Sequence, residues 1–283
     1  MSAAAGISRP SFALSVDVED YFQVWAFSSV VSRSSWDGFS LRVGDNTRRC
    51  LDLFDNHNAK ATFFTLGWVA ERDPDLIRDI VARGHELASH GFDHTKVNEQ
   101  TRDEFLADVT KTKAILEDIS GAEVKGYRAA GFSIGKATPW AHDVLAEAGH
   151  CYSSSTHPIA HDHYGDAKAP QSPYEIAGML EAPVATVNLF GKRVSAAGGG
   201  WFRAAPLALS KALLTKAASA LDGPAIFYFH PWEIDPDQPR LNRAPLKSKI
   251  RHYLNLNRME AKLAKTLDAF SWGRIDEALG LRQ

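Results

Sequence analysis

Short apolar runs alternate along the chain with amphipathic segments of helical period, and this alternation restricts the folds open to it. The apolar runs, rich in strand-forming residues, occupy residues 11–16, 60–66, 84–88 and 225–229, with shorter ones at 151–155, 179–184 and 187–190. The amphipathic segments occupy residues 45–54, 74–83, 101–119, 139–148 and 206–221. Strands and helices that alternate with short connections form parallel sheets or barrels. The sequence therefore predicts an α/β protein.

Three of the apolar runs are followed directly by side chains that bind metals or transfer protons. In chain order these are Asp17, Glu19, Asp20, His90, His94 and His230. In parallel α/β folds, active sites are built at the carboxyl ends of the strands. Two histidines four residues apart can direct two ring nitrogens at one divalent ion. Each feature also has a structural interpretation, because carboxylates occur in solvated turns and single histidines occur in cores.

Arg128 follows a further short strand, where an arginine either faces solvent or holds a carboxylate through two parallel hydrogen bonds. Aromatic residues near the strand ends are candidates for the wall of a substrate pocket, although such residues also form ordinary core. The candidates are Tyr21, Trp25, Phe132, Trp201 and Trp232. A polar loop with His157, His161, Asp162 and His163 would form a second metal site only if a rigid element aligned its ligands.

The composition is that of an ordinary globular protein, with 45% hydrophobic and 23% charged residues among 283. A formal net charge of −2 gives no indication of a nucleic-acid partner. The two cysteines, Cys50 and Cys151, exclude a disulfide scaffold and favour a reducing compartment. No apolar stretch approaches the ~20 residues that cross a bilayer. The first ten residues lack the basic start and apolar run of a signal peptide, so we expect a cytoplasmic protein.

We expect three parts in the chain: a disordered lead at residues 1–11, one α/β domain at residues 12–240, and a helical extension at residues 241–283. Residues 247–270 of the extension combine apolar residues at helical spacing with six basic residues. A basic helix docked on the domain with a solvated face is the simpler interpretation. A peripheral contact with a membrane surface or an anionic polymer is the alternative.

Taken together, the strand ends resemble the motifs of the polysaccharide deacetylases, carbohydrate esterase family 4, which share the NodB homology domain. Asp17-Val18-Glu19-Asp20 is similar to their first motif, in which one Asp is the general base and another carboxylate binds a metal. His90-Gly91-Phe92-Asp93-His94 matches the second motif, whose two histidines bind that metal. Arg128 matches the arginine of the third motif, which orients the base, and His230 matches the catalytic histidine of the fifth.

The resemblance covers residues 12–235, and the whole chain is most similar to the deacetylases of exosortase and exopolysaccharide loci. Two departures stand out. Strand alternation puts Asp17 and Glu19 on one face, whereas a turn after Val18 would bring Asp20 to Asp17 instead. The resemblance favours Asp17 as base and Asp20 as metal ligand, with Glu19 as the alternative. Where the fourth motif offers an Asp to tune the histidine, this chain has Ser153, and the candidates to replace it are Asp162, Glu233 and Asp235.

The resemblance implies an irregular (β/α)7 barrel and a hydrolase that removes N-acetyl groups from amino sugars of a polysaccharide or its precursor, in exopolysaccharide biosynthesis. It implies one divalent ion, Zn²⁺, as cofactor. In that chemistry Asp17 takes a proton from water and Arg128 orients Asp17. A backbone N–H near Ala129 and Ala130 stabilises the oxyanion, and His230 protonates the leaving amine.

The expected partner is an acetylated glycan or a lipid-linked precursor. Three alternatives stay open. The first is an amidohydrolase that acts on a small non-peptide amide. The second is a catalytically silent sugar-binding homologue. The third is a structural partner in an export assembly that binds through the basic tail.

Overall fold

A computed structural model describes residues 9–160 and 165–281. The greater part of the expected lead, and His161, Asp162 and His163 of the polar loop, lie outside the described residues. Seven parallel strands pair side by side in the order β10-β1-β2-β3-β4-β5-β7. Their bounds are β1 (Phe12–Val18), β2 (Ala61–Thr65), β3 (Glu86–Ser89), β4 (Gly126–Tyr127), β5 (Tyr152–Ser153), β7 (Met179–Glu181) and β10 (Ala225–Phe229).

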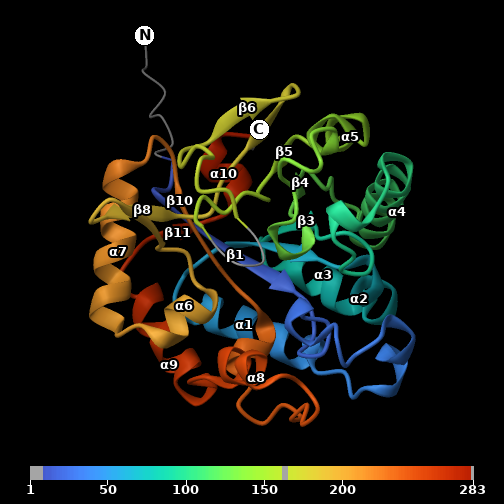
Figure 1. Cartoon of the computed structure of the whole chain (residues 1–283), viewed down its shortest axis with the longest axis horizontal. Coiled ribbons are helices and arrows are strands. Elements are labelled where there is room, and N and C mark those ends of the chain that lie inside the picture. The colour runs from blue at the N-terminus through green and yellow to red at the C-terminus, as the bar shows by residue number, and fades with distance from the viewer. Residues whose placement is uncertain (1–8, 161–164, 282–283) are drawn as a thin grey trace.

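The sheet curls on itself (Figure 1). Its two ends meet at one place. Val184, just after β7, forms a parallel bridge with Ile226 in β10, and Ala185 N–H donates to the Ile226 carbonyl at 2.9 Å. The expected irregular barrel of seven parallel strands is thereby confirmed. It is irregular because β4 and β5 have two residues each and because a single bridge joins β10 to the segment after β7.

Four further strands lie outside the seven-stranded parallel sheet and pair with its strands or with each other. β6 (Tyr174–Ile176) runs antiparallel to β7, β8 (Thr186–Leu189) forms a hairpin with β9 (Lys192–Ser195), and β11 (Trp272–Gly273) pairs with the first residues of β1. The strand expected at residues 187–190 corresponds to β8, which pairs antiparallel with β9. A hairpin turn at Phe190-Gly191, where both residues have φ near +50° to +75°, sets this pairing.

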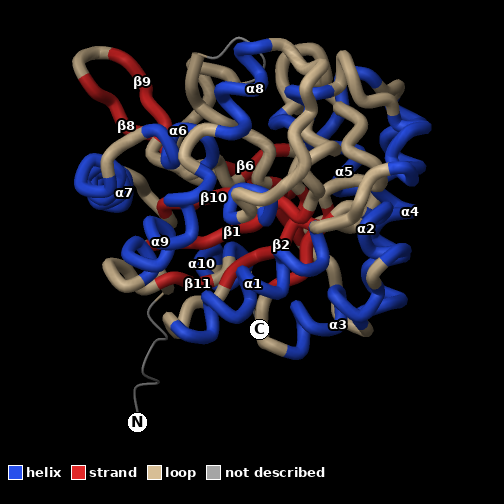
Figure 2. The backbone as a smooth tube through the Cα atoms, turned by 90° about the horizontal axis from the view of Figure 1, so that it is seen from below, coloured by secondary structure: helices blue, strands red, loops and turns tan. Residues whose placement is uncertain are grey.

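Helices surround the sheet (Figures 1 and 2). They are α1 (Val43–Asn56), α2 (Gly67–Arg72), α3 (Pro74–Ala82), α4 (Arg102–Ser120), α5 (Ala141–Glu147), α6 (Gly199–Ala204), α7 (Leu207–Ala220), α8 (Leu246–Tyr253), α9 (Leu256–Leu267) and α10 (Ile275–Leu279). Local sequence explains where several begin and end. The side chains of Thr101 and Glu104 cap the start of α4, and Gly121 ends it with a φ of +66°. Among the described helices, none is long and apolar enough to cross a membrane.

The main core contains apolar side chains from both ends of the chain. Leu14 and Val16 of β1 belong to the same buried cluster as Phe227 and Phe229 of β10. The apolar face of α9 enters this cluster through Leu256, Met259, Leu263 and Leu267. Residues beyond 240, which the sequence analysis assigned to a separate helical extension, therefore contribute side chains to the main hydrophobic core.

The loop before α6 approaches β10 closely at Gly198. This residue has φ +50° and ψ −149°, a backbone conformation that residues with a Cβ atom rarely adopt. A Cβ built on Gly198 would lie 1.7 Å from the Tyr228 carbonyl oxygen, which is a backbone atom of a buried strand. Glycine is thus required here for the loop to lie against the strand that ends at His230.

Gly198→Ala is expected to lower the free energy of unfolding by about 2 kcal/mol or more, because either the loop or β10 must move. Urea denaturation followed by circular dichroism measures the change. Gly200→Ala is the matched control, since its Cβ would meet nothing nearer than Arg203 Nη2 at 3.8 Å. Equal stability of the two variants would show that the loop moves freely away from β10.

Candidate active site

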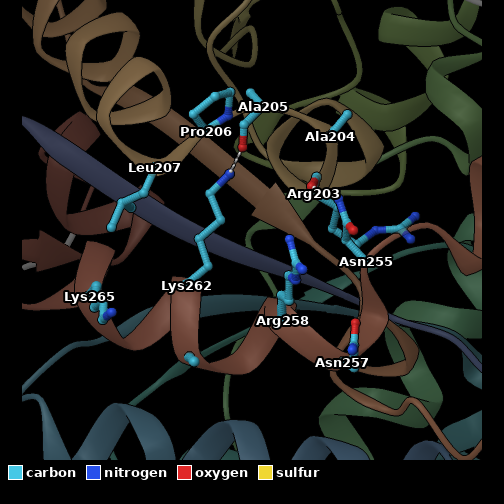
Figure 3. Close-up of a pocket in the computed structure, with 11 residues that line it drawn as sticks. Arg203, Ala204, Ala205, Pro206, Leu207, Asn255, Asn257, Arg258, Lys262 and Lys265 are labelled. Carbon is cyan, nitrogen blue, oxygen red and sulfur yellow. Dashed lines mark hydrogen bonds between the residues drawn. The ribbon is translucent and has the colours of Figure 1, made fainter.

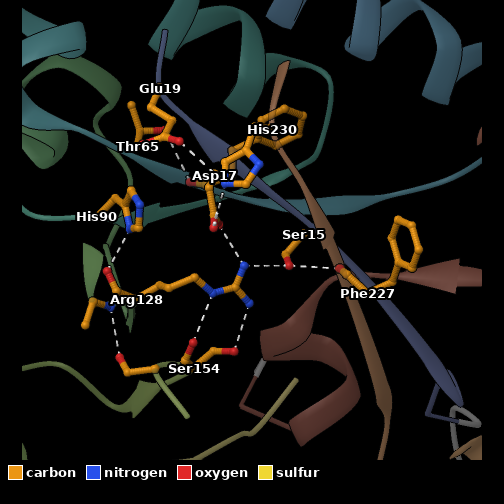
Figure 4. A network of polar contacts seen from close by, with 12 residues as sticks. Ser15, Asp17, Glu19, Thr65, His90, Arg128, Ser154, Phe227 and His230 are labelled. Carbon is orange, nitrogen blue, oxygen red and sulfur yellow. Dashed lines mark hydrogen bonds and ion pairs between the residues drawn. The ribbon is translucent and has the colours of Figure 1, made fainter. Parts of the chain in front are cut away.

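The carboxyl ends of β1, β3 and β10 bring together the residues that the sequence singled out (Figure 4). Asp17 and Glu19 come from the end of β1, His90 follows β3, and His230 follows β10. All of them are at least largely buried, with His230 the most accessible at 20% side-chain exposure. The alternation of apolar runs and polar ends therefore builds one site, as expected for a parallel barrel.

Glu19, His90 and His94 form a cluster that could hold a metal ion. One ligand atom from each lies within 4.8 Å of the others, and Glu19 Oε2 is 2.8 Å from His94 Nε2. His90 Nδ1 donates to the Arg128 carbonyl at 2.8 Å, which fixes the ring and leaves Nε2 for a ligand bond. His94 has φ +60°, a left-handed conformation that residues with a side chain seldom adopt, and its Nε2 lies against Glu19.

The chemistry of this donor set fits a divalent transition metal. Two imidazoles and one carboxylate are the ligands of many zinc sites that keep a position open for water. Glu19 Oε2 is buried, and its close contact is His94 Nε2 at 2.8 Å, so a cation bound by both atoms would compensate the buried carboxylate. Burial alone would raise the pKa of Glu19, but His94, His230 and His90 lower it to about 2. Burial lowers the pKa of His90 to about 4, which favours the neutral ring that metals bind.

Asp20, which the sequence analysis preferred as the metal carboxylate, lies elsewhere. Its oxygens accept hydrogen bonds from the backbone N–H groups of Tyr21, Arg42 and Val43 at 2.7–3.0 Å. It thereby caps the start of α1, and burial raises its pKa to about 6. Glu19 N–H donates to the Asp17 carbonyl at 3.0 Å, so the chain turns at Val18, and Glu19, not Asp20, lies against His94. The structure therefore places Glu19, the alternative, in the cluster with His90 and His94, and it places Asp20 outside that cluster.

Asp17 is held by the buried guanidinium of Arg128. Arg128 Nη1 donates to Asp17 Oδ1 at 2.7 Å and to Ser15 Oγ at 2.9 Å. Its Nε and Nη2 donate to the carbonyl and the hydroxyl of Ser154 at 3.0 and 2.9 Å (Figure 4). Arg128 therefore makes one hydrogen bond to Asp17, whereas the sequence analysis expected two. Its remaining donors bind serines, which fix the guanidinium in place.

His230 has a carboxylate partner even though position 153 is a serine. Its Nδ1 donates to Glu233 Oε1 at 2.8 Å, and Glu233 Oε2 accepts from Arg203 Nε at 2.6 Å. Burial alone would lower the pKa of His230, but Glu233, Glu19 and Asp17 raise it to about 9. Of the candidate replacements, Asp235 instead pairs with Arg42, and Asp162 lies outside the described residues. Ser153 donates to Ser155.

Sequence reasoning missed Arg203. It lies in α6, and its donors other than Nε bind the carbonyls of Arg251, His252 and Leu254 at 2.6–2.9 Å. Nothing in the local sequence distinguishes this arginine from a surface residue. Its role is apparent only from the structure, in which Arg203 is 4% exposed and contacts Glu233, the partner of His230.

A cleft of about 440 Å³ opens over the cluster, and we call it the substrate cleft. Four of the five predicted aromatic residues line it: Trp25, Phe132, Trp201 and Trp232. Tyr21 does not, because it is 1% exposed and packs edge-on against Phe22 and Phe39. Lys96, which the sequence analysis did not select, also lines the cleft, and its Nζ lies 3.7 Å from the centre of the Trp25 ring.

A second hollow of about 550 Å³, the cationic pocket, lies beside the cleft and shares Ala204 with it (Figure 3). Arg203, Arg258, Lys262 and Lys265 line it, and no carboxylate does among the described residues. Lys262 donates to the carbonyls of Phe202 and Ala205 and to Ser210, so it anchors α6 on α9. Among the described residues, its lining contains no carboxylate, histidine or cysteine.

Comparison with known proteins agrees with this geometry. Residues 35–153 match the family model of polysaccharide deacetylases, and residues 154–280 match a domain of unknown function, DUF3473. A peptidoglycan-N-acetylglucosamine deacetylase of Bacillus cereus is 35% identical over 82 residues, which are 29% of this chain and 30% of that protein. A chitooligosaccharide deacetylase of a Bradyrhizobium species is 32% identical over 111 residues, 38% of this chain and 47% of that protein. The chain thus spans less than half the length of these curated relatives.

Among solved structures, one assigned as a polysaccharide deacetylase from Mycobacterium smegmatis aligns with 96% of this chain and 90% of its own, with a TM-score of 0.57 and 19% identity. This chain shares its fold with that structure and with a mutant of a carbohydrate esterase family 4 pseudoenzyme, which aligns with 96% of this chain at 16% identity and a TM-score of 0.50. The match to the polysaccharide deacetylase model is confined to residues 35–153, and the match to the DUF3473 model takes up the chain from residue 154 to residue 280.

Glu19→Gln is expected to weaken the binding of Zn²⁺ by roughly two orders of magnitude or more, because the neutral amide is a poor ligand. Asp20→Asn is the matched isosteric control and should retain the ion. Calorimetric titration of metal-free protein with Zn²⁺ measures both. Loss of binding in Asp20→Asn, with normal binding in Glu19→Gln, would contradict the assignment of the cluster.

Proposed function

We propose that the protein is a metal-dependent hydrolase that removes N-acetyl groups from the amino sugars of a glycan. One observation carries the proposal. The carboxylate of Asp17 and the imidazole of His230 both adjoin the metal-ligand cluster, with His230 Nε2 3.5 Å from Glu19 Oε1 and 3.9 Å from Asp17 Oδ2. A base and an acid at one metal site are what hydrolysis of an amide requires.

A divalent ion held by Glu19, His90 and His94 would polarise the acetamide carbonyl and lower the pKa of water. Asp17, oriented by Arg128, accepts the proton of the water whose oxygen attacks the carbonyl carbon. His230 gives its proton to the amine nitrogen as the carbon–nitrogen bond breaks, so that acetate and a free amino sugar leave. The Ala129 N–H is bound to Ser155 Oγ, which leaves Ala130 as the backbone donor for the oxyanion.

The family and the cleft support a sugar substrate. Matched relatives are named for deacetylation of peptidoglycan N-acetylglucosamine and of chitooligosaccharides. Aromatic side chains such as Trp25 and Trp201, 37% and 56% exposed at the cleft, can stack on sugar rings. The catalytically silent alternative arose from Ser153, and the contact between Glu233 and His230 supplies the carboxylate that this position lacks.

We further propose zinc as the metal and a role in exopolysaccharide synthesis, the latter because the whole chain resembles deacetylases of exopolysaccharide loci. The two cysteines, Cys50 and Cys151, are unpaired, which supports a cytoplasmic location. There the enzyme would meet an oligosaccharide or a lipid-linked precursor of the polymer.

The proposal predicts that the purified protein releases acetate from N-acetylated chitooligosaccharides and that added Zn²⁺ restores activity after chelation. His230→Ala should fold, bind metal and lose roughly 10²–10⁴-fold in rate, because the amine then departs without a positioned acid. On an activated aryl acetate the loss should be smaller, since that leaving group needs no proton.

His57→Ala removes an imidazole outside the site and is the control. Parental turnover of glycans by a folded, zinc-loaded His230→Ala protein would overturn the proposed mechanism. Turnover of small amides but not of glycans would reassign the enzyme to amidohydrolase chemistry.

Glu233→Gln is expected to reduce the rate of deacetylation by roughly 10–100-fold while KM changes little, because an amide no longer fixes the ring of His230 as a carboxylate does. Asp235→Asn, two residues further on, is the control and should keep most activity. Steady-state kinetics on a chitooligosaccharide measure both variants. If Glu233→Gln retains the parental rate constant, Glu233 has no positioning role.

A further inference from the structure

Helix α8 leaves apolar side chains uncovered beside the substrate cleft. Leu246, Ile250 and Leu254, spaced by four residues, are 68%, 56% and 39% exposed. In α9, by contrast, Leu256, Met259, Leu263 and Leu267 are all buried. The predicted basic tail therefore divides into a helix that packs in the core and a helix that presents an apolar face to solvent. Folding of this chain alone does not explain that second face.

The exposed apolar face continues around the mouth of the cleft. Ile250 and Leu254 line the cleft together with Trp25 and Trp201, which are themselves exposed. Figure 2 shows α8 on the loop-rich side of the molecule, away from β11 and α10. Aromatic rings suit sugars, but leucine and isoleucine side chains offer a glycan no stacking surface. A hydrocarbon environment is the better match for this rim.

The same region carries a concentrated positive charge. Residues 240–265 contain eight basic residues and one acidic residue, in a chain whose formal net charge is −2. Lys247 and Arg251 line the cleft, and Arg258 and Lys265 line the cationic pocket (Figure 3). Positive charge around an apolar, tryptophan-bearing rim is complementary to an anionic lipid surface, which offers phosphates at the headgroups and hydrocarbon beneath them.

We propose that this face, defined by α8, Trp25 and Trp201, docks on an anionic lipid bilayer, with Leu246 and Ile250 inserted below the headgroups. The cleft mouth would then open at the membrane surface. This inference goes beyond the proposed deacetylation and does not require it, because binding to lipid is measured without turnover.

The test is sedimentation of the full chain with vesicles of phosphatidylcholine and phosphatidylglycerol, compared with vesicles of phosphatidylcholine alone. We expect binding to the anionic vesicles only, weakened as NaCl rises from about 0.05 M to about 0.5 M. The variant Leu246→Ser/Lys249→Glu should lose roughly tenfold or more in vesicle affinity. Neither residue lines the cleft, so acetate release from a soluble chitooligosaccharide should be unchanged.

Leu209→Ser/Lys211→Glu is the matched control, because Leu209 on α7 is also exposed, at 47%, and lies outside the cleft lining. No binding to anionic vesicles, equal binding to neutral vesicles, or an equal loss in the α7 variant would each overturn the proposal. Binding of short-chain lipid monomers without binding to vesicles would also overturn it and assign the rim to a substrate's acyl chain. Absence of acetate release would end the proposed function but leave the vesicle result readable.

Discussion

The interior of the barrel depends on one buried charge. The side chain of Arg128 is fully buried, and an unpaired guanidinium in such a place would cost several kcal/mol. Its partners come from different strands: Ser15 and Asp17 from β1, and Ser154 just after β5. The guanidinium also lies 4.1 Å from the centre of the Phe64 ring of β2. These contacts of the guanidinium therefore hold β1, β2 and the end of β5 in fixed relative positions. They also orient Asp17, the proposed base.

The site draws on both segments that the family comparisons distinguish. His90, His94 and Arg128 lie in the segment that matches polysaccharide deacetylases, whereas His230 and its support, Glu233 and Arg203, lie in the DUF3473 segment. Because Arg203 also binds carbonyls at the end of α8, the packing of the C-terminal helices sets the position of the proposed acid. The DUF3473 segment is thus part of the proposed catalytic site.

The sequence pattern predicted an α/β fold, because each apolar run and each helical period depends on residues close together in the chain. The resemblance to a known family supplied the expectation of a seven-stranded barrel. The sequence pattern also predicted that Asp17, His90 and His230 would meet, since strand ends share one edge of a parallel sheet. It could not decide between Glu19 and Asp20, because that choice depends on the start of α1, more than twenty residues later, which needs a cap.

The sequence also could not predict two other features that depend on contacts between residues far apart in the chain. Whether an aromatic residue lines a pocket or fills a core depends on packing, and Tyr21 fills the core. The support of Glu233 by Arg203 joins residues 30 positions apart without any periodic signal. The roles proposed for these side chains follow from where the structure places them.

The pairing of β1 with β10 has a consequence for how the chain reaches this structure. The first strand lies between β2 and a strand about 210 residues later, and Ser15 Oγ already bonds to Phe227 across that separation. Contacts so distant in sequence carry a large loop-closure entropy and slow the folding of a domain. During synthesis, β1 keeps an open edge until the last strand of the barrel has emerged. Nascent chains are therefore exposed to mispairing along that edge, and the contact between His230 and Glu19 requires the pairing of β10 with β1.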